Sequence, residues 1–511
     1  MTQINSKDDS TSADDVYPTG RVSNVMSAAR PMILSVTFRF NAVLDPSKLH
    51  SALCTLLNTG DWRRFGGRLR KPVKGETLQI IKLHVPRPYT ESRPPVAYSH
   101  LDHSGVLISE HELGKKLPEV SGKNAAVYGS AEDFREFAAA EDLPDTIDGY
   151  LVEGEDRPVL SLRITSFADA TLVAVAVPHL IVDAMAIGEL MSAWSLVVNG
   201  RLDEVPPVIS AHEDLDYDVA DPALVGTDES EKEPWALQSS YLTGFSFFLF
   251  VVRFLWDVMT GSKVENRVLY LPKATLDKMR AGAIDDIATH DSQQDNPKTV
   301  KPWVSEGDVL FAWTCRMVSL AQGTSPRPIN ALNTVNLRGR LPEITAPATG
   351  GAFTTGLATA AFMPVSPTEA RGPLGLLAAK SRATLTTQAT PTQILKTLRA
   401  TRASVDAGKD AGLVCGAPPT GELFVLTNWI KADLGGVVDF SAAVVVKGDE
   451  EERRKLGKIV YLHSQAHARS ATLRNAMGAV GKDGEGNVWL VGYFEPRTWD
   501  AMRRELGKMD S

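Results

Sequence analysis

The sequence predicts an α/β fold of two similar-sized domains, in which mixed β-sheets are flanked by helices. Three observations favour this class: strand patterns are followed by helical patterns in both halves, 511 residues exceed what one core usually serves, and 43% hydrophobic with 23% charged residues is ordinary for a folded protein. We expect a disordered tail at residues 1–20, domains at 21–215 and 266–511, and a crossover linker at 216–265.

Charge and cysteine usage exclude several classes of protein. The 54 Lys and Arg against 62 Asp and Glu give a formal charge of −8, which is poorly suited to holding a nucleic-acid backbone. Cys54, Cys315 and Cys415 are too far apart for a CxxC site or a disulfide framework. Residues 1–15 lack the basic and apolar runs of a secretory signal. We therefore expect a cytoplasmic monomer with no nucleic-acid partner.

The N-terminal half contains two strand–helix units. Residues 32–41 alternate like a half-buried strand, and Asp45 caps a helix whose Pro46 suits the first turn and whose apolar face comprises Leu49, Leu53, Leu56 and Leu57. Residues 71–157 indicate loops and short strands. Strands at 159–165 and 172–177 follow, the second apolar enough to be buried on both faces. Pro178 ends it, and a helix at 181–198 stops before Gly200.

The C-terminal half repeats this order after a solvated, acidic and proline-rich connection at residues 206–234. We predict strands at 267–271, 332–337 and 422–427, helices at 274–282, 306–321 and within 369–406, a charged loop at 285–298, a Gly/Thr-rich stretch at 347–356, and a closing strand–turn–strand–helix that ends within 487–506.

One apolar segment, residues 241–259, complicates the cytoplasmic prediction. Arg253 and Asp257 interrupt it, so its uninterrupted part is shorter than the ~20 residues that a membrane span needs. We expect a helix packed on the protein's own surface. Peripheral contact with a membrane interface is the alternative.

His179 and Asp183 stand in PHLIVDA, where a buried strand passes into a helix. An imidazole at such a position can accept a proton from a substrate hydroxyl, and the aspartate can orient it or brace the loop. The plain structural alternative is that His179 only satisfies backbone groups while Asp183 is the helix N-cap. Spacing alone does not decide between these readings.

The same segment resembles the His-x-x-x-Asp-Gly motif of the BAHD-type acyl-CoA-dependent acyltransferases. Four further blocks follow that family's order and are similar to its fungal members: LDPSKLHSALCTLLNTGDWRRFGGRLRK at 44–71, EGDVLFAWTCR at 306–316, VNLRGRL at 335–341 and LTNWIKADLGGVVDF at 426–440. The resemblance implies two chloramphenicol-acetyltransferase-like domains with a solvent channel between them. It also implies acyl-CoA, specifically acetyl-CoA, as co-substrate, a small-molecule hydroxyl acceptor, and no bound cofactor or metal.

By this resemblance His179 is the general base of an O-acyltransferase of fungal specialised metabolism. Asp183 would hold the loop by pairing with Arg338, or with Arg340 as second choice, and Asp439 would support the channel. Thr427, Asn428 and Trp429, in place of the family's Thr-Ser-Trp, would contact substrate; strand packing is the alternative for them.

This sequence departs from the family pattern at three points. Ala184 follows Asp183 where glycine is usual, Ser441-Ala442-Ala443 replaces Gly-Trp-Gly, and Gly350-Gly351 replaces Gly-Asn. The last change leaves the oxyanion donor open between Thr354 and Thr427. The altered Gly-Trp-Gly block keeps open a cyclisation or condensation without coenzyme A, and the apolar segment 241–259 keeps open a non-catalytic, membrane-associated binding protein. His463 and His467 would share a helical face, but HSQAH lacks the glutamate of a zinc site.

Overall fold

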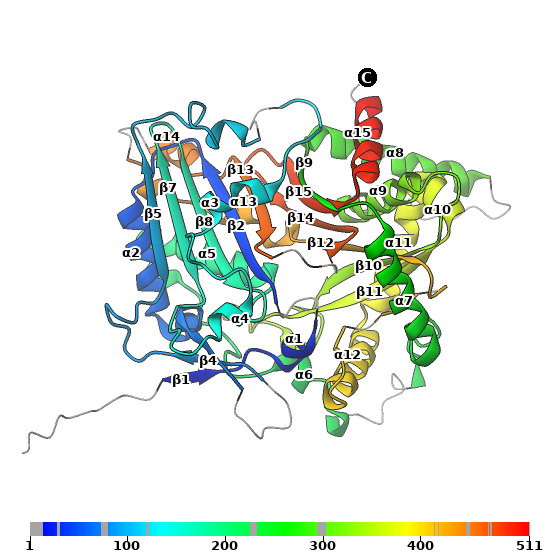
Figure 1. Cartoon of the computed structure of the whole chain (residues 1–511), viewed down its shortest axis with the longest axis horizontal. Coiled ribbons are helices and arrows are strands. Elements are labelled where there is room, and N and C mark those ends of the chain that lie inside the picture. Colours follow the sequence, from blue (N-terminus) through cyan, green and yellow to red (C-terminus); the bar gives the residue numbers. More distant parts are fainter. Residues whose placement is uncertain are drawn as a thin grey trace, which may run out of the picture.

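Two mixed β-sheets and a small antiparallel one organise the chain (Figure 1). The computed structural model describes residues 14–27, 31–72, 80–118, 122–224, 232–293, 303–412, 414–416, 418–445, 450–468, 470 and 473–509. The small sheet runs in the order β1-β4-β3, with β1 at Asp15–Tyr17, β4 at Lys82–Val85 and β3 at Arg68–Arg70.

The first large sheet has the strand order β13-β2-β8-β7-β5 and supports the site. Its strands are Tyr461–Ala466 (β13), Ile33–Phe40 (β2), Thr171–Pro178 (β8), Ser161–Phe167 (β7) and Ala97–His103 (β5). β5 and β7 are parallel and the other pairs antiparallel. Every residue of β8 is buried, as its continuous Val/Ala run predicts.

The second large sheet has the order β11-β10-β12-β14-β15-β9-β6. Its strands are Ala358–Val365 (β11), Ile329–Asn336 (β10), Glu422–Asn428 (β12), Ala476–Lys482 (β14), Val488–Phe494 (β15), Glu265–Leu271 (β9) and Ala126–Val127 (β6). The pairs β10–β12 and β12–β14 are parallel. Around this sheet lie helices α8 (Lys273–Ser292), α9 (Glu306–Ala321), α10 (Pro367–Arg371), α11 (Leu374–Gln388), α12 (Pro391–Asp406) and α15 (Pro496–Met509).

Each large sheet takes a strand from the other half of the chain. β13 belongs to the C-terminal half but pairs with β2 from Tyr461↔Arg39 to Ala466↔Leu34. In return, β6 of the N-terminal half pairs with β9. The chain division predicted at residue 266 therefore coincides closely with the start of β9 without separating the two sheets.

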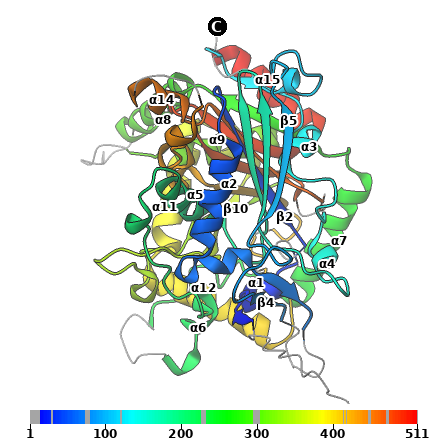
Figure 2. The ribbon, with the colours of Figure 1, turned by 90° about the vertical axis from the view of Figure 1, so that its left-hand side faces the viewer.

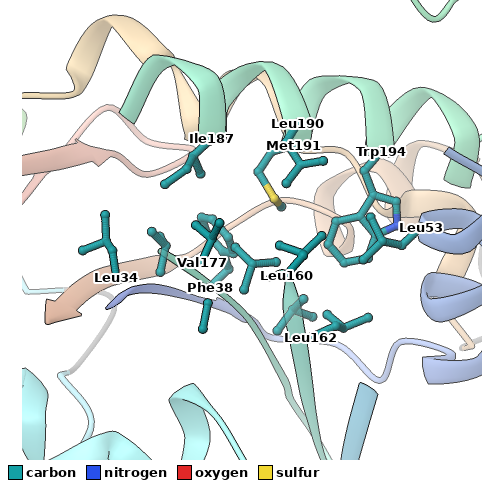
Figure 3. Packing of buried hydrophobic residues seen from close by; sticks show 14 of the residues in the cluster. Leu34, Phe38, Leu53, Leu160, Leu162, Val177, Ile187, Leu190, Met191 and Trp194 are labelled. Carbon is teal, nitrogen blue, oxygen red and sulfur yellow. The ribbon is translucent and has the colours of Figure 1, made fainter. Parts of the chain in front are cut away.

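Helices α2 (Pro46–Leu57) and α5 (Ala184–Val198) cover one face of the first sheet; Figure 2 looks onto α2. Asp45 caps α2 by accepting hydrogen bonds from the backbone N–H groups of Ser47 and Lys48, as predicted. Figure 3 shows the side chains that α5 directs onto the strands: Ile187, Leu190, Met191 and Trp194. The Trp194 indole N–H also donates to the carbonyl of Leu49 at 3.0 Å, which fixes α5 against α2.

Several sequence predictions need correction. Of the predicted disordered tail, residues 1–13 lie outside the described residues, but Asp15–Tyr17 forms β1 because it pairs with β4. β2 is buried on both faces rather than half-buried, because helix α3 (Arg135–Ala138) packs against it in addition to α2 and α5 on the sheet. α8 continues to Ser292, through part of the predicted loop at 285–298, because Ala283 and Ile287 extend its buried face; residues 294–302 lie outside the described residues.

The apolar segment forms helix α7 (Gly244–Thr260), which lies at the edge of the molecule in both ribbon views (Figures 1 and 2). Among the described residues, we find no helix with the length and apolar character needed to span a bilayer.

Candidate active site

His179 is the first residue after the buried strand β8. Its backbone N–H donates to the carbonyl of Met32 at 2.9 Å, which ties the strand end to the start of β2. The His179 side chain is partly exposed, whereas Leu180, Ile181 and Val182 after it are buried. His179 is thus a partly exposed side chain between a buried strand and three buried apolar residues.

The Asp183 carboxylate is surrounded by four hydrogen-bond donors. It accepts hydrogen bonds from Arg338 Nη1 at 2.8 Å and Nη2 at 3.0 Å, and from the backbone N–H groups of Ala186 and Leu357, both at 2.8 Å. The Ala186 contact makes Asp183 the N-cap of α5. The carboxylate therefore both starts the helix and reaches across to the C-terminal half.

The charge pair is nearly enclosed by protein. The Asp183 and Arg338 side chains are 12% and 10% exposed. Burial alone would raise the pKa of Asp183, but the Arg338 guanidinium and the hydrogen bonds from it, Leu357 and Ala186 outweigh burial and hold that pKa below its ordinary value. Asp183 is thus held as a carboxylate at neutral pH.

Arg338 connects this pair to the segment that follows β10. Its guanidinium also donates to Asn336 Oδ1 at 3.1 Å and to the carbonyl of Thr355 at 2.7 Å. Arg340, the second predicted partner, donates instead to the carbonyls of Asn336 and Ala389. The loop at 179–183 is therefore held from the C-terminal half by Arg338 and not by Arg340.

Arg64 is a further contact to this loop that sequence reasoning missed. The side chain is fully buried, and its Nη1 donates to the carbonyls of Ile181 at 3.3 Å and Thr354 at 2.5 Å. Burial lowers its pKa to about 10. Arg64 thus links the histidine loop to the Gly/Thr-rich stretch from within the N-terminal half. The sequence did not predict this burial, because Arg64 stands among other basic residues in WRRFGGRLRK, a pattern typical of an exposed segment.

The remaining predicted site residues lie on two other segments. The Thr354 hydroxyl is buried and has no hydrogen-bond partner within the described ranges. Thr427, Asn428 and Trp429 are partly exposed at the end of β12. Asn428 Oδ1 accepts from the backbone N–H of Ile430 at 3.0 Å, which stabilises a turn, and Trp429 packs against the core of the N-terminal half. In the part of the chain that the structure describes, no hydrogen bond joins these three residues to the histidine loop.

Comparison with known proteins identifies the family. A model of the Transferase family matches residues 132–442. O-acetyltransferase PaAT-2 from Phomopsis amygdali is 34% identical over 505 residues, which cover 97% of this chain and 98% of that protein. The chain belongs to the Transferase family of BAHD-type acyltransferases. A second relative of this acyltransferase, acetyltransferase pyiB from Pyricularia grisea, is 31% identical over 96% of this chain and 94% of its own length.

Solved structures confirm the predicted fold class of the acyltransferase. TRI101 of F. graminearum, complexed with coenzyme A and T-2 mycotoxin, is similar with a TM-score of 0.62 at 13% identity, covering 97% of this chain and 99% of that one. Vinorine synthase gives a TM-score of 0.54 at 14% identity, covering 98% and 95%. Mixed sheets flanked by helices are common to all three proteins.

Asp439 of the acyltransferase lies at the far end of α5 from the histidine loop. Its backbone N–H donates to Ser195 Oγ at 3.0 Å, and its carboxylate accepts from the backbone N–H of Ser441 at 3.0 Å. The neighbouring Phe440 ring is buried, 4.8 Å from Trp194 and 5.4 Å from Phe40 between ring centroids. These contacts join the altered motif to the core below α5.

A cavity of about 640 Å³ opens beside Asp439, lined by basic side chains: Lys48, Arg201, Arg453, Arg454 and Lys458. The nearest α5 residue that lines it, Ser192, is about 14 Å along the helix from Asp183 at 1.5 Å per residue. Residues 179–183 are not among its lining residues, so the cavity is separate from the histidine loop.

The His463–His467 pair of the acyltransferase does not share a helical face, because residues 461–466 form strand β13. His463 is fully buried, and burial lowers its pKa to about 3. Among the described residues, no three His, Cys, Asp or Glu side chains are grouped to hold a metal. The predicted helical face was wrong because the four-residue spacing of the two histidines suggested a helix, whereas pairing with β2 makes residues 461–466 a strand.

Proposed function

We propose that this acyltransferase moves an acetyl or related acyl group from coenzyme A to a hydroxyl of a small-molecule specialised metabolite, with His179 as general base. Its relatives carry the names O-acetyltransferase and acetyltransferase, and TRI101 was solved with coenzyme A and a mycotoxin. The observation that carries the residue assignment is the partly exposed His179 at the end of a fully buried strand.

The reaction needs only one proton acceptor and correct placement. The His179 imidazole takes the proton of the acceptor hydroxyl, and the oxygen forms a bond to the thioester carbonyl carbon. The C–S bond then breaks, coenzyme A leaves as the thiolate, and the imidazolium returns a proton to it. Binding both substrates beside one imidazole lowers the entropic part of the activation barrier, because the two reactants are already held together. No acyl-enzyme intermediate is required.

The loop contacts support positioning roles. Arg338 and Arg64 hold the loop after His179 at two points, the Asp183 carboxylate and the Ile181 carbonyl. Thr354 supports a role as oxyanion donor because its hydroxyl is buried and uncommitted in the described structure; Thr427 is the second candidate. Trp429 is proposed as an acceptor-side wall and Asn428 as a neighbour of substrate, while Asp439 supports the distant end of α5.

The test follows free thiol after the protein is mixed with acetyl-CoA and a panel of hydroxylated terpenoid or polyketide alcohols. We expect His179→Ala to lower kcat by about 10²–10⁴-fold, the usual contribution of a general base. His290→Ala is the matched control, since that side chain is 46% exposed and lies on α8 of the C-terminal half. Full turnover by His179→Ala would refute the assignment.

The replacement of Gly-Trp-Gly by Ser441-Ala442-Ala443 favours a second candidate, a cyclisation or condensation without coenzyme A. Calorimetry with acetyl-CoA separates the two functions. Heat of binding together with thiol release supports acyl transfer. Absence of both, with conversion of a pathway intermediate, supports the second candidate.

A further inference from the structure

Helix α7 exposes large apolar side chains of a kind that an ordinary surface helix buries. Of its seventeen residues, only Phe250 is buried. The apolar face of α7 consists of large side chains at positions i, i+3, i+7, i+10, i+11 and i+14, which is one side of a helix. These residues and their exposed fractions are Phe245 (73%), Phe248 (57%), Val252 (48%), Leu255 (51%), Trp256 (57%) and Met259 (78%).

The opposite side of α7 carries its charges and faces the protein. Asp257 accepts from Arg253 at 3.0 Å on the same helix and from Arg327 at 2.7 Å on the C-terminal half. These groups line a polar cavity of about 330 Å³ together with Glu422 and Glu495. The helix is therefore attached through these ion pairs and through the buried Phe250, which together determine which side faces outward.

Hydrogen bonds define both ends of α7, and one of them ties its C-terminus to another segment. Thr243 and Ser246 form a capping box at the N-terminus. At the C-terminus, the Gly261 N–H donates to the carbonyl of Asp257 at 3.0 Å, and Arg474 Nη1 donates to the carbonyl of Ser262 at 3.3 Å. A rotation that hid the apolar face would break the Asp257 ion pairs. The exposed face is thus a fixed feature of the fold.

Its area and composition favour a lipid interface over a second copy of the chain. Aromatic side chains carry roughly 150–250 Å² each, so at these exposures the apolar face presents on the order of 700 Å². Two convex helices crossing would cover only part of it, below the roughly 800 Å² per partner of a stable dimer. A bilayer interface needs no complementary shape, and Trp, Phe and Leu are the side chains that interfacial helices bury in it.

We propose that α7 docks this acyltransferase on phospholipid bilayers, lying in the interface with its apolar face among the acyl chains. The occupant is the zwitterionic bilayer itself. The formal charge of −8 gives the chain no general attraction to anionic headgroups. Binding is therefore driven by apolar burial, and salt has little effect on it.

The experiment is vesicle flotation of the full chain with pure phosphatidylcholine vesicles at 0.1 and 0.5 M salt. Three proteins are compared: wild type, F248S/L255S/W256S, and the matched control V152S/L224S/V445S, which removes side chains that are 60%, 68% and 59% exposed elsewhere. We expect wild type and control to float equally at both salt concentrations, and the α7 variant to lose at least tenfold in vesicle partitioning. Circular dichroism and the thermal unfolding midpoint stay unchanged in all three proteins, which verifies that they are folded.

A second measurement observes Trp256 directly. Brominated phosphatidylcholine quenches wild-type fluorescence more than that of W256F if the indole enters the bilayer. The proposal is overturned if wild type does not bind phosphatidylcholine, if the α7 variant floats as well as wild type, or if 0.5 M salt releases the protein. It is also overturned if sedimentation shows a dimer that F248S/L255S/W256S converts to a monomer, since a second copy then covers the face. None of these outcomes depends on His179.

Discussion

Removing Arg338 should leave a buried carboxylate without its cation. In Arg338→Met, Asp183 loses two of its four donors and keeps the backbone N–H groups of Ala186 and Leu357. Because the carboxylate is only 12% exposed, water cannot fully replace the guanidinium. Breaking one partner of a buried pair typically costs about 3–5 kcal/mol. We therefore expect the free energy of unfolding to fall by about 3 kcal/mol, with a loss of kcat because the histidine loop loosens.

The assay is urea unfolding followed by tryptophan fluorescence, combined with a double-mutant cycle. Asp183→Asn in the Arg338→Met background removes both charges, so the double variant should be more stable than the sum of the single losses predicts, by about 1–3 kcal/mol. The pKa of Asp183 is held below its ordinary value, so the pair's stabilisation is present at neutral pH and is lost as pH falls below about 4. The deficit of Arg338→Met should accordingly shrink in acid.

Arg340→Met provides the matched control. Its guanidinium bonds two carbonyls and no carboxylate, so its loss should cost about 1 kcal/mol without coupling to Asp183. A loss below about 1 kcal/mol for Arg338→Met, or strict additivity with Asp183→Asn, would refute the reasoning.

Three further predictions concern other named residues. His463 has a pKa of about 3 in the folded chain against about 6.5 in the unfolded chain, so the unfolded chain binds more protons below pH 6.5. This residue alone should therefore lower the free energy of unfolding by about 2 kcal/mol between pH 8 and pH 5. Thermal unfolding of His463→Leu should show a correspondingly flatter pH profile, and an unchanged profile would contradict the prediction. His179→Gln, which keeps a polar side chain without a basic nitrogen, should retain the wild-type melting temperature while thiol release falls about 10²-fold or more; equal turnover would remove the base from His179. Arg64→Met removes a costly buried charge together with two carbonyl contacts, and because these effects oppose each other the free energy of unfolding should change by less than about 2 kcal/mol. We expect kcat to fall at least tenfold and Arg64→Lys to recover part of it. A large stability loss with unchanged kcat per folded molecule would show a purely structural role.

Local signals in the sequence located most of the elements that carry the site. The N-cap at Asp45 and the helix predicted at 306–321 match α2 and α9, because caps and helical periodicity act within a few residues. The continuous apolar run of β8 and the proline that ends it likewise placed His179 at a strand end. The Asp183–Arg338 contact was anticipated from family resemblance, because no local pattern joins residues 155 apart.

The features missed are those fixed by distant partners. Strand β13 pairs with β2, more than 400 residues earlier, so the four-residue spacing between His463 in the strand and His467 just after it wrongly indicated a helix. Arg64 is satisfied by carbonyls 117 and 290 residues away, and a backbone acceptor leaves no trace in side-chain patterns. The outward apolar face of α7 follows from ion pairs with Arg327, which composition alone does not reveal.

The exchange of β13 and β6 between halves constrains how the polypeptide matures on the ribosome. β2 and β8 emerge early, but the edge of β2 that β13 later covers stays bare until roughly 300 more residues have been made, about 15–60 s at ordinary elongation rates. An apolar strand with unsatisfied N–H and C=O groups is a template for aggregation during that interval. Truncation before residue 461 should therefore yield insoluble nascent chains rather than a smaller folded domain, and chaperone supply should limit expression yield.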